Sequence, residues 1–121
     1  MKRLEIRIGT LKDAADDFSR AWHAAAKGRT AARASSALIF ETPAALYSAI
    51  SDRRMALVRH VAAHPDLSIR ALAAALRRDY KRVHTDVSQL ERLGLIRRNE
   101  AGRLHAPYDE ILIRAPLRAA A

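Results

Sequence analysis

The sequence has 121 residues, which suits one compact domain with an accessory segment, and it contains no cysteine. Lys and Arg number 22 against 13 Asp and Glu, and the resulting net charge of +9 favours a polyanionic partner. Without cysteine, disulfides and thiolate metal sites are excluded, and we expect a cytoplasmic protein. No uncharged stretch approaches the roughly 18 residues of a membrane span, so a membrane partner is not expected.

Many of the apolar residues of the chain are alanines, whose side chains are small. It contributes 26 residues, whereas Leu, Ile, Val and Phe together contribute 28 of 121. A core made from so few large side chains is thin, and a second subunit would stabilise it. We therefore expect a homodimer.

Residues 1–41 are expected to form a strand-helix-strand extension. Apolar and charged side chains alternate over residues 2–8, the period of a half-buried strand, and residues 37–40 form a second short strand. Between them, Leu11, Phe18 and Trp22 recur at helical spacing on one face. Because about 40 residues bury little surface alone, we expect these three side chains at a dimer or partner interface.

Residues 42–115 follow the element order of a winged helix-turn-helix, and residues 116–121 form a short tail. Thr42, Ser68 and Asp79 are placed to cap three of the helices, and Gly94 ends the last one. The expected elements are helices over residues 44–50, 52–64, 69–76 and 80–93 and strands over residues 95–98, 103–106 and 109–114. The predicted fold class is thus α+β, mainly helical, with an N-terminal strand-helix-strand extension.

The expected helix over residues 80–93 has one apolar and one polar face. Val83, Val87 and Leu90 share the face that must be buried. The opposite face carries hydrogen-bonding side chains suited to phosphates and base edges, namely Lys81, Thr85, Ser88 and Arg92, flanked by Arg82 and Gln89. Asp86 and Glu91 fall between the two faces.

A basic hairpin follows this helix. It carries Arg97, Arg98 and Arg103, and the stretch from Arg77 to Arg103 holds eight Lys and Arg against four Asp and Glu. The positive charge therefore coincides with the two elements that contact DNA in a winged helix-turn-helix. The candidate DNA contacts are Arg78, Tyr80, Lys81, Arg82, Thr85, Ser88, Gln89, Arg97, Arg98 and Arg103.

Three sequence stretches resemble the winged helix of MarR-like bacterial regulators: LSIRALA at residues 67–73, DYKRVHTDV at 79–87 and LERLGLI at 90–96. Together with PYDEILIR at residues 107–114, they make the chain similar to the TumA-like antitoxins of type II toxin–antitoxin systems. The resemblance implies a dimeric repressor that binds its own operator and neutralises a toxin protein. Because this chain begins with strand-helix-strand instead of the long terminal helices of MarR-like dimers, their dimer mode is not carried over.

We therefore predict a sequence-specific regulator of double-stranded DNA, whose two-fold dimer would read a palindromic operator. The alternative is a protein-interaction module on a winged-helix scaffold, which neutralises or bridges a partner without specific DNA binding. In that case residues 4–8 or 111–113 would pair with the edge of a partner's sheet. An RNA-binding role is disfavoured because Tyr80 is the single aromatic residue on the proposed contact surface.

Catalysis has no support in the sequence. His60 and His64 have metal-ligand spacing, but HVAAH lacks the glutamate of a zinc-protease helix and no third ligand is evident. The four glycines are scattered, so neither a P-loop nor a dinucleotide fingerprint is present. We expect no enzyme activity, no cofactor and no metal site.

Overall fold

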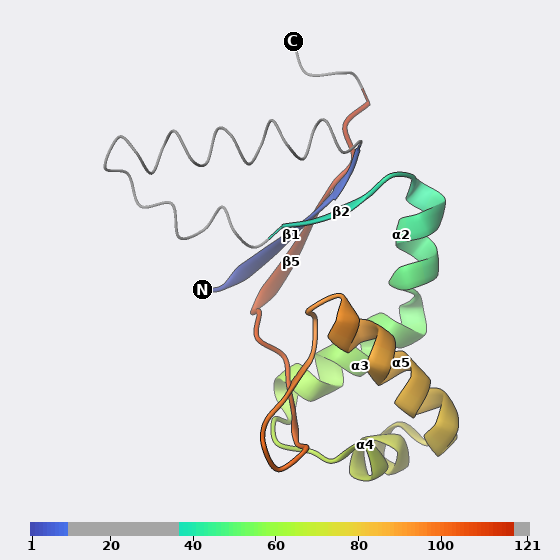
Figure 1. The fold of residues 1–121 in the computed structure, drawn as a ribbon, viewed down its shortest axis with the longest axis vertical. Coiled ribbons are helices and arrows are strands. Elements are labelled where there is room, and N and C mark those ends of the chain that lie inside the picture. Colours follow the sequence, from blue (N-terminus) through green and yellow to red (C-terminus); the bar gives the residue numbers. More distant parts are fainter. Residues whose placement is uncertain (10–36, 118–121) are drawn as a thin grey trace. The chain divides into compact units, whose positions relative to one another are not determined.

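The computed structural model, which describes residues 1–9 and 37–117, is an α+β structure, as the sequence predicted (Figure 1). The chain divides into two compact units. One consists of Met1–Tyr47 with Glu110–Ala121, and the other of Ser48–Asp109. Within the described ranges, no helix is long and apolar enough to cross a membrane.

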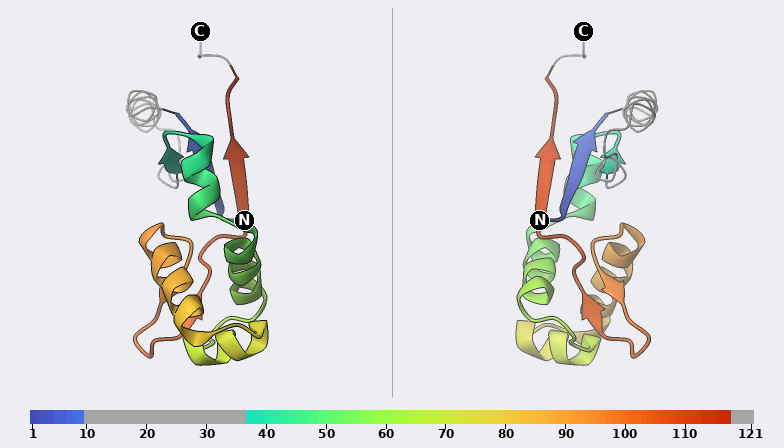
Figure 2. Two further views of the ribbon diagram at one scale, coloured as in Figure 1. Left: turned by 90° about the vertical axis from the view of Figure 1, so that its right-hand side faces the viewer. Right: turned by 90° about the vertical axis from the view of Figure 1, so that its left-hand side faces the viewer.

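The first unit contains a three-stranded parallel sheet. Strand β1 (Arg3–Ile8) lies between β2 (Ala37–Phe40) and β5 (Glu110–Arg114), as Figure 2 shows. The predicted alternation of β1 is confirmed, because Leu4 and Ile6 are buried. The helix predicted between the first two strands, with Leu11, Phe18 and Trp22, lies outside the described residues.

The partner of strand β5 differs from expectation. The sequence assigned this strand to the segment 42–115, but it pairs with β1, with Leu4 opposite Ile111. Alternation of apolar side chains identifies a strand without identifying its neighbour, and a parallel pair always joins segments separated by a long connection. The last strand of the chain therefore belongs to the first unit.

Four helices are described: α2 (Pro43–Ala49), α3 (Asp52–Ala63), α4 (Ile69–Leu76) and α5 (Tyr80–Arg92). Each begins after a polar side chain that accepts a hydrogen bond from a backbone N–H three residues later. The capping residues are Thr42, Ser51, Ser68 and Asp79. Such a cap contributes about 1 kcal/mol, so these caps explain where the helices begin. Three of them, Thr42, Ser68 and Asp79, are those that the sequence predicts.

The second unit has its own apolar core, formed by side chains of α3, α4, α5 and the hairpin. Its buried members are Ile50, Leu57, Val58, Val61, Ile69, Leu72, Ala73, Val83, Val87, Leu90, Leu95, Ile96 and Leu104. Each fully buried Val or Leu contributes roughly 1.5–3 kcal/mol. Burial of Val83, Val87 and Leu90, as predicted, determines which face of α5 is turned to solvent.

An antiparallel hairpin of β3 (Arg97–Arg98) and β4 (Leu104–His105) follows α5. Both strands are shorter than predicted. Leu95, which is expected in the first strand, belongs to the turn that ends α5. Its N–H donates to the carbonyl of Leu90, and Gly94 before it has a φ of 83°. The hairpin turn is the predicted one, and the Asn99 side chain accepts hydrogen bonds from two backbone N–H groups within it.

Candidate functional site

The solvent-facing side of α5 combines cationic and hydroxyl side chains. Lys81, Arg82 and Thr85 are exposed, and Thr85 Oγ1 donates a hydrogen bond to the Lys81 carbonyl at 3.0 Å. Among the described residues, neither the Lys81 nor the Arg82 side chain has an ion-pair or hydrogen-bond partner. Their charges are therefore available to a ligand.

The start and the middle of this helix differ in accessibility. At its start, Tyr80 is exposed and the Arg70 guanidinium lies 5.6 Å from the centre of its ring, within the range of a cation–π contact. Further along, Ser88 and Gln89 are half-buried. The first two turns of α5 thus present more reachable side chains than the middle of the helix.

Arg78 is oriented differently from the other predicted contacts. Its Nη2 atom lies 2.6 Å from Oδ2 of Asp86, and the two side chains are only 19% and 15% exposed. The Arg78 side chain therefore lies against α5 and does not extend into solvent. The sequence predicts this residue as a DNA contact, but one edge of its guanidinium is paired with Asp86 within the unit.

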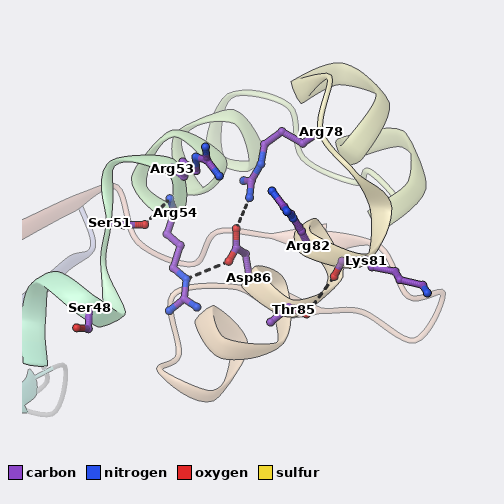
Figure 3. Close-up of a pocket in the computed structure, with 9 residues that line it drawn as sticks. All are labelled: Ser48, Ser51, Arg53, Arg54, Arg78, Lys81, Arg82, Thr85 and Asp86. Carbon is purple, nitrogen blue, oxygen red and sulfur yellow. Dashed lines mark hydrogen bonds and ion pairs between the residues drawn. The ribbon is translucent and has the colours of Figure 1, made fainter.

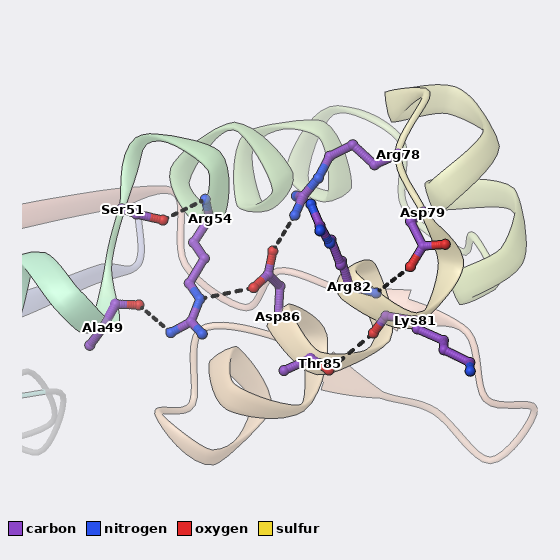
Figure 4. A network of polar contacts seen from close by, with 9 residues as sticks. All are labelled: Ala49, Ser51, Arg54, Arg78, Asp79, Lys81, Arg82, Thr85 and Asp86. Atoms are coloured by element: carbon purple, nitrogen blue, oxygen red, sulfur yellow. Dashed lines mark hydrogen bonds and ion pairs between the residues drawn. The ribbon is translucent and has the colours of Figure 1, made fainter.

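Arg54, which no sequence pattern indicates as a site residue, completes the cluster around Asp86 (Figure 4). Its Nε atom lies 3.2 Å from Asp86 Oδ1, and its Nη1 atom donates to the Ala49 carbonyl at 2.9 Å. One carboxylate on α5 therefore connects α3 with the turn that precedes α5. Thirty-two positions separate Arg54 from Asp86, and no local spacing signals a pair of that kind.

The arginines of the hairpin are exposed, but they are not equally available. Arg98 Nε lies 3.3 Å from Glu91 Oε2, in a pair of partly exposed side chains. Arg103 Nη1 donates weakly to the Asp66 carbonyl at 3.4 Å. The side chain of Arg97 has no partner among the described residues. Arg97 is thus the most available charge of the three.

Asp66 anchors the hairpin to the segment that precedes α4. Its Oδ1 accepts a hydrogen bond from Asn99 Nδ2 at 3.2 Å, and its N–H donates to the Leu104 carbonyl. Leu104 in turn donates to the Leu67 carbonyl at 2.8 Å. These contacts hold the turn and the returning strand of the hairpin, so the ribbon that carries the arginines is supported by the rest of its unit.

An open cleft of about 470 Å³ lies beside the Asp86 cluster, within the second unit (Figure 3). All of its lining residues are polar or charged: Ser48, Ser51, Arg53, Arg54, Arg78, Lys81, Arg82, Thr85 and Asp86. The charged and hydroxyl groups of this cleft suit a polar anion.

His60 and His64 stack on one another, with their ring centres 4.4 Å apart. Over residues 1–9 and 37–117, no three side chains of His, Asp or Glu are grouped as a metal site requires. The contact between these histidines is therefore described as aromatic stacking.

A protein-family model described as HVO_A0114 matches residues 49–113, more than half of the chain. The match covers α3, α4, α5 and the hairpin and extends into β5. No curated protein and no solved structure matches the chain.

Proposed function

The chain belongs to the HVO_A0114 family, and we propose that it is a sequence-specific transcriptional regulator of double-stranded DNA. In this proposal α4 and α5 form a helix-turn-helix, α5 is the recognition helix, and the β3–β4 hairpin is the wing. The order of helix, short helix, tight turn, longer helix and antiparallel hairpin supports this assignment.

The observation that carries the proposal is the exposed polar face of α5. Lys81, Arg82 and Thr85 lie there, opposite the buried side chains that hold the helix in the core. A helix of 13 residues is about 20 Å long at 1.5 Å per residue, and the major groove admits a helix. The exposed face can therefore meet base edges and phosphates together.

The side chains have different roles in this proposal. Thr85 is suited to read a base edge, whereas Lys81 and Arg82 supply charge for phosphates. Arg97 and Arg103 contact the backbone from the wing. In this proposal Arg78 positions the recognition helix through its ion pair with Asp86.

A two-fold homodimer would place two recognition helices about 34 Å apart, one turn of DNA. A palindromic operator is the matching ligand. The resemblance to TumA-like antitoxins extends the proposal to a repressor of its own operon that also neutralises a toxin. Co-expression with any short reading frame encoded beside its gene, followed by purification through a tag on one chain only, tests this extension.

A second candidate is a protein-interaction module that uses the sheet of the first unit. Because β1 is the central strand of the described sheet, its residues 5–7 pair with a strand on both sides. The expectation that residues 4–8 receive a partner's strand therefore does not fit this sheet, since no free edge runs along them. β5 is an edge strand of the described sheet, and Ile113 is 51% exposed. That edge favours strand addition by a partner at residues 111–113.

A mobility-shift assay on the DNA upstream of the coding region tests the leading proposal. We expect a discrete complex with this duplex, and weaker binding for Lys81→Ala and Arg82→Ala. Exposed charges that contact phosphate contribute to affinity in a strongly salt-dependent way, so the titration is repeated at several salt concentrations. Unchanged affinity in both variants would rule out α5 as the recognition helix.

A further inference from the structure

The cleft beside Asp86 carries more positive charge than its one carboxylate can balance. Five cationic residues line it, and Asp86 is the single acid among its lining residues. Because the ammonium of one of them, Lys81, points away, four guanidinium groups face one carboxylate and three positive charges remain formally uncompensated (Figure 3). Asp86 is half-buried and pairs with both Arg54 and Arg78. The other cationic side chains that line the cleft do not pair with this carboxylate.

Two of those cations are available to a ligand. Arg53, in the first turn of α3, and Arg82, in the first turn of α5, are exposed. Neither guanidinium has an ion-pair or hydrogen-bond partner among the residues that the structure describes. In Figure 3 the Arg82 side chain points toward Arg78, whereas the Lys81 ammonium points away from the cleft.

The cleft also contains hydrogen-bonding capacity that the protein leaves unused. Arg78 Nη1 is buried and has no acceptor in the described part of the chain. Ser51 Oγ accepts from the Arg54 N–H, which leaves its own hydroxyl proton free to donate. An anion with several oxygens would supply acceptors to these donors and reduce the repulsion between neighbouring guanidinium groups.

We propose that this cleft binds a phosphate group, held by the guanidinium groups of Arg53 and Arg82. A phosphate offers oxygens in several directions, and guanidinium groups bind it through paired hydrogen bonds. A single carboxylate would balance only one of the three uncompensated charges. The lining has no apolar side chain, so recognition concerns the phosphate itself.

The phosphate has two sources that share this chemistry: the DNA backbone and a small phosphorylated molecule. In the first case the inference rests on the proposed function, and it adds α3 to the DNA-contacting elements through Arg53. In the second case the bound molecule would occupy Arg82 and compete with DNA for the exposed face of α5.

Calorimetric titration of the full chain with pyrophosphate at constant ionic strength tests the free-ligand source. Arg53→Gln removes one anchor, and Arg59→Gln removes the same charge from an exposed position of α3 that does not line the cleft. We expect Arg53→Gln to weaken pyrophosphate binding about tenfold, the scale of one charge-assisted hydrogen bond, and Arg59→Gln to leave it unchanged. Circular dichroism spectra of both variants check that the helices are retained.

Titration of the same proteins with a duplex of mixed sequence, at several salt concentrations, tests the DNA source. If the backbone fills the cleft, Arg53→Gln lowers the salt dependence by about one phosphate contact and Arg59→Gln does not. A difference between the two variants with either probe supports the proposal and identifies the source of the phosphate.

Equal behaviour of Arg53→Gln and Arg59→Gln with both probes would overturn the proposal, as would a wild-type chain that binds neither. Failure of the proposed function has a different signature. In that case the wild-type chain binds no duplex, while pyrophosphate binding still distinguishes the two variants.

Discussion

Arg78 donates a hydrogen bond to Asp86 across 2.6 Å, and this contact ties the turn after α4 to the middle of α5. Arg54 approaches the other oxygen of the same carboxylate from α3. The direction of α5 within its unit therefore depends on one acidic side chain as well as on the apolar core.

Asp86→Asn is expected to lower the free energy of unfolding by about 2 kcal/mol. The substitution leaves two half-buried guanidinium groups without their anion, and hydrogen bonds to charged groups contribute about 1.5–3 kcal/mol. Urea denaturation, followed by circular dichroism, measures the difference. Glu91→Gln is the matched control, because the Glu91–Arg98 pair is more exposed and should contribute less than about 1 kcal/mol. Equal effects of the two substitutions would contradict a supporting role for Asp86.

Arg77→Gly is expected to stabilise the protein by about 0.5 kcal/mol. Arg77 ends α4 with a φ of 54° and a ψ of 47°, a left-handed conformation that costs a residue with a Cβ atom about 1–2 kcal/mol. Glycine avoids this cost, although its greater freedom in the unfolded chain offsets part of the gain. Thermal melting compares Arg77→Gly with Arg77→Ala, which removes the same charge but keeps the Cβ atom. If both variants gain the same thermal stability, the effect comes from removal of the charge and not from the backbone conformation.

The sequence predicted local structure more successfully than long-range pairing. The buried positions of α5, such as Val83 and Val87, follow from helical periodicity, and Ser68 and Asp79 follow from the chemistry of helix caps. Both signals depend on residues within one or two turns of each other. For this reason they could be read without a structure.

Contacts between distant segments could not be read in the same way. The Arg54–Asp86 pair joins residues 32 positions apart, and the pairing of β5 with β1 joins the two ends of the sequence. A charged residue in the sequence indicates an ion pair, and an alternating segment indicates a strand, but neither signal says which acid or which strand is the partner. Only the packing of α3 against the rest of its unit selects Asp86 for Arg54.

Arg97→Ala is expected to weaken binding to every DNA duplex by a similar factor. Arg97 is exposed on β3, its side chain has no partner among the described residues, and a wing arginine contacts phosphate without reading sequence. The slope of affinity against salt concentration should fall by about one contact. Fluorescence anisotropy with the upstream duplex and with a scrambled duplex provides the comparison. A loss confined to the upstream duplex would show that Arg97 reads bases instead.

Thr85→Ala is expected to change the preference among operator sequences while leaving the salt dependence intact. Thr85 lies on the exposed face of α5, and its hydroxyl and methyl groups are suited to a base edge and to a thymine methyl group. The loss should appear as about 1–3 kcal/mol at one base position, measured with duplexes that each carry one substitution in the operator. Thr85→Ser retains the hydroxyl and removes the methyl group, so it separates the two contacts. A uniform loss across all duplexes would mean that Thr85 contacts the backbone, and base reading by α5 would then depend on its other exposed side chains.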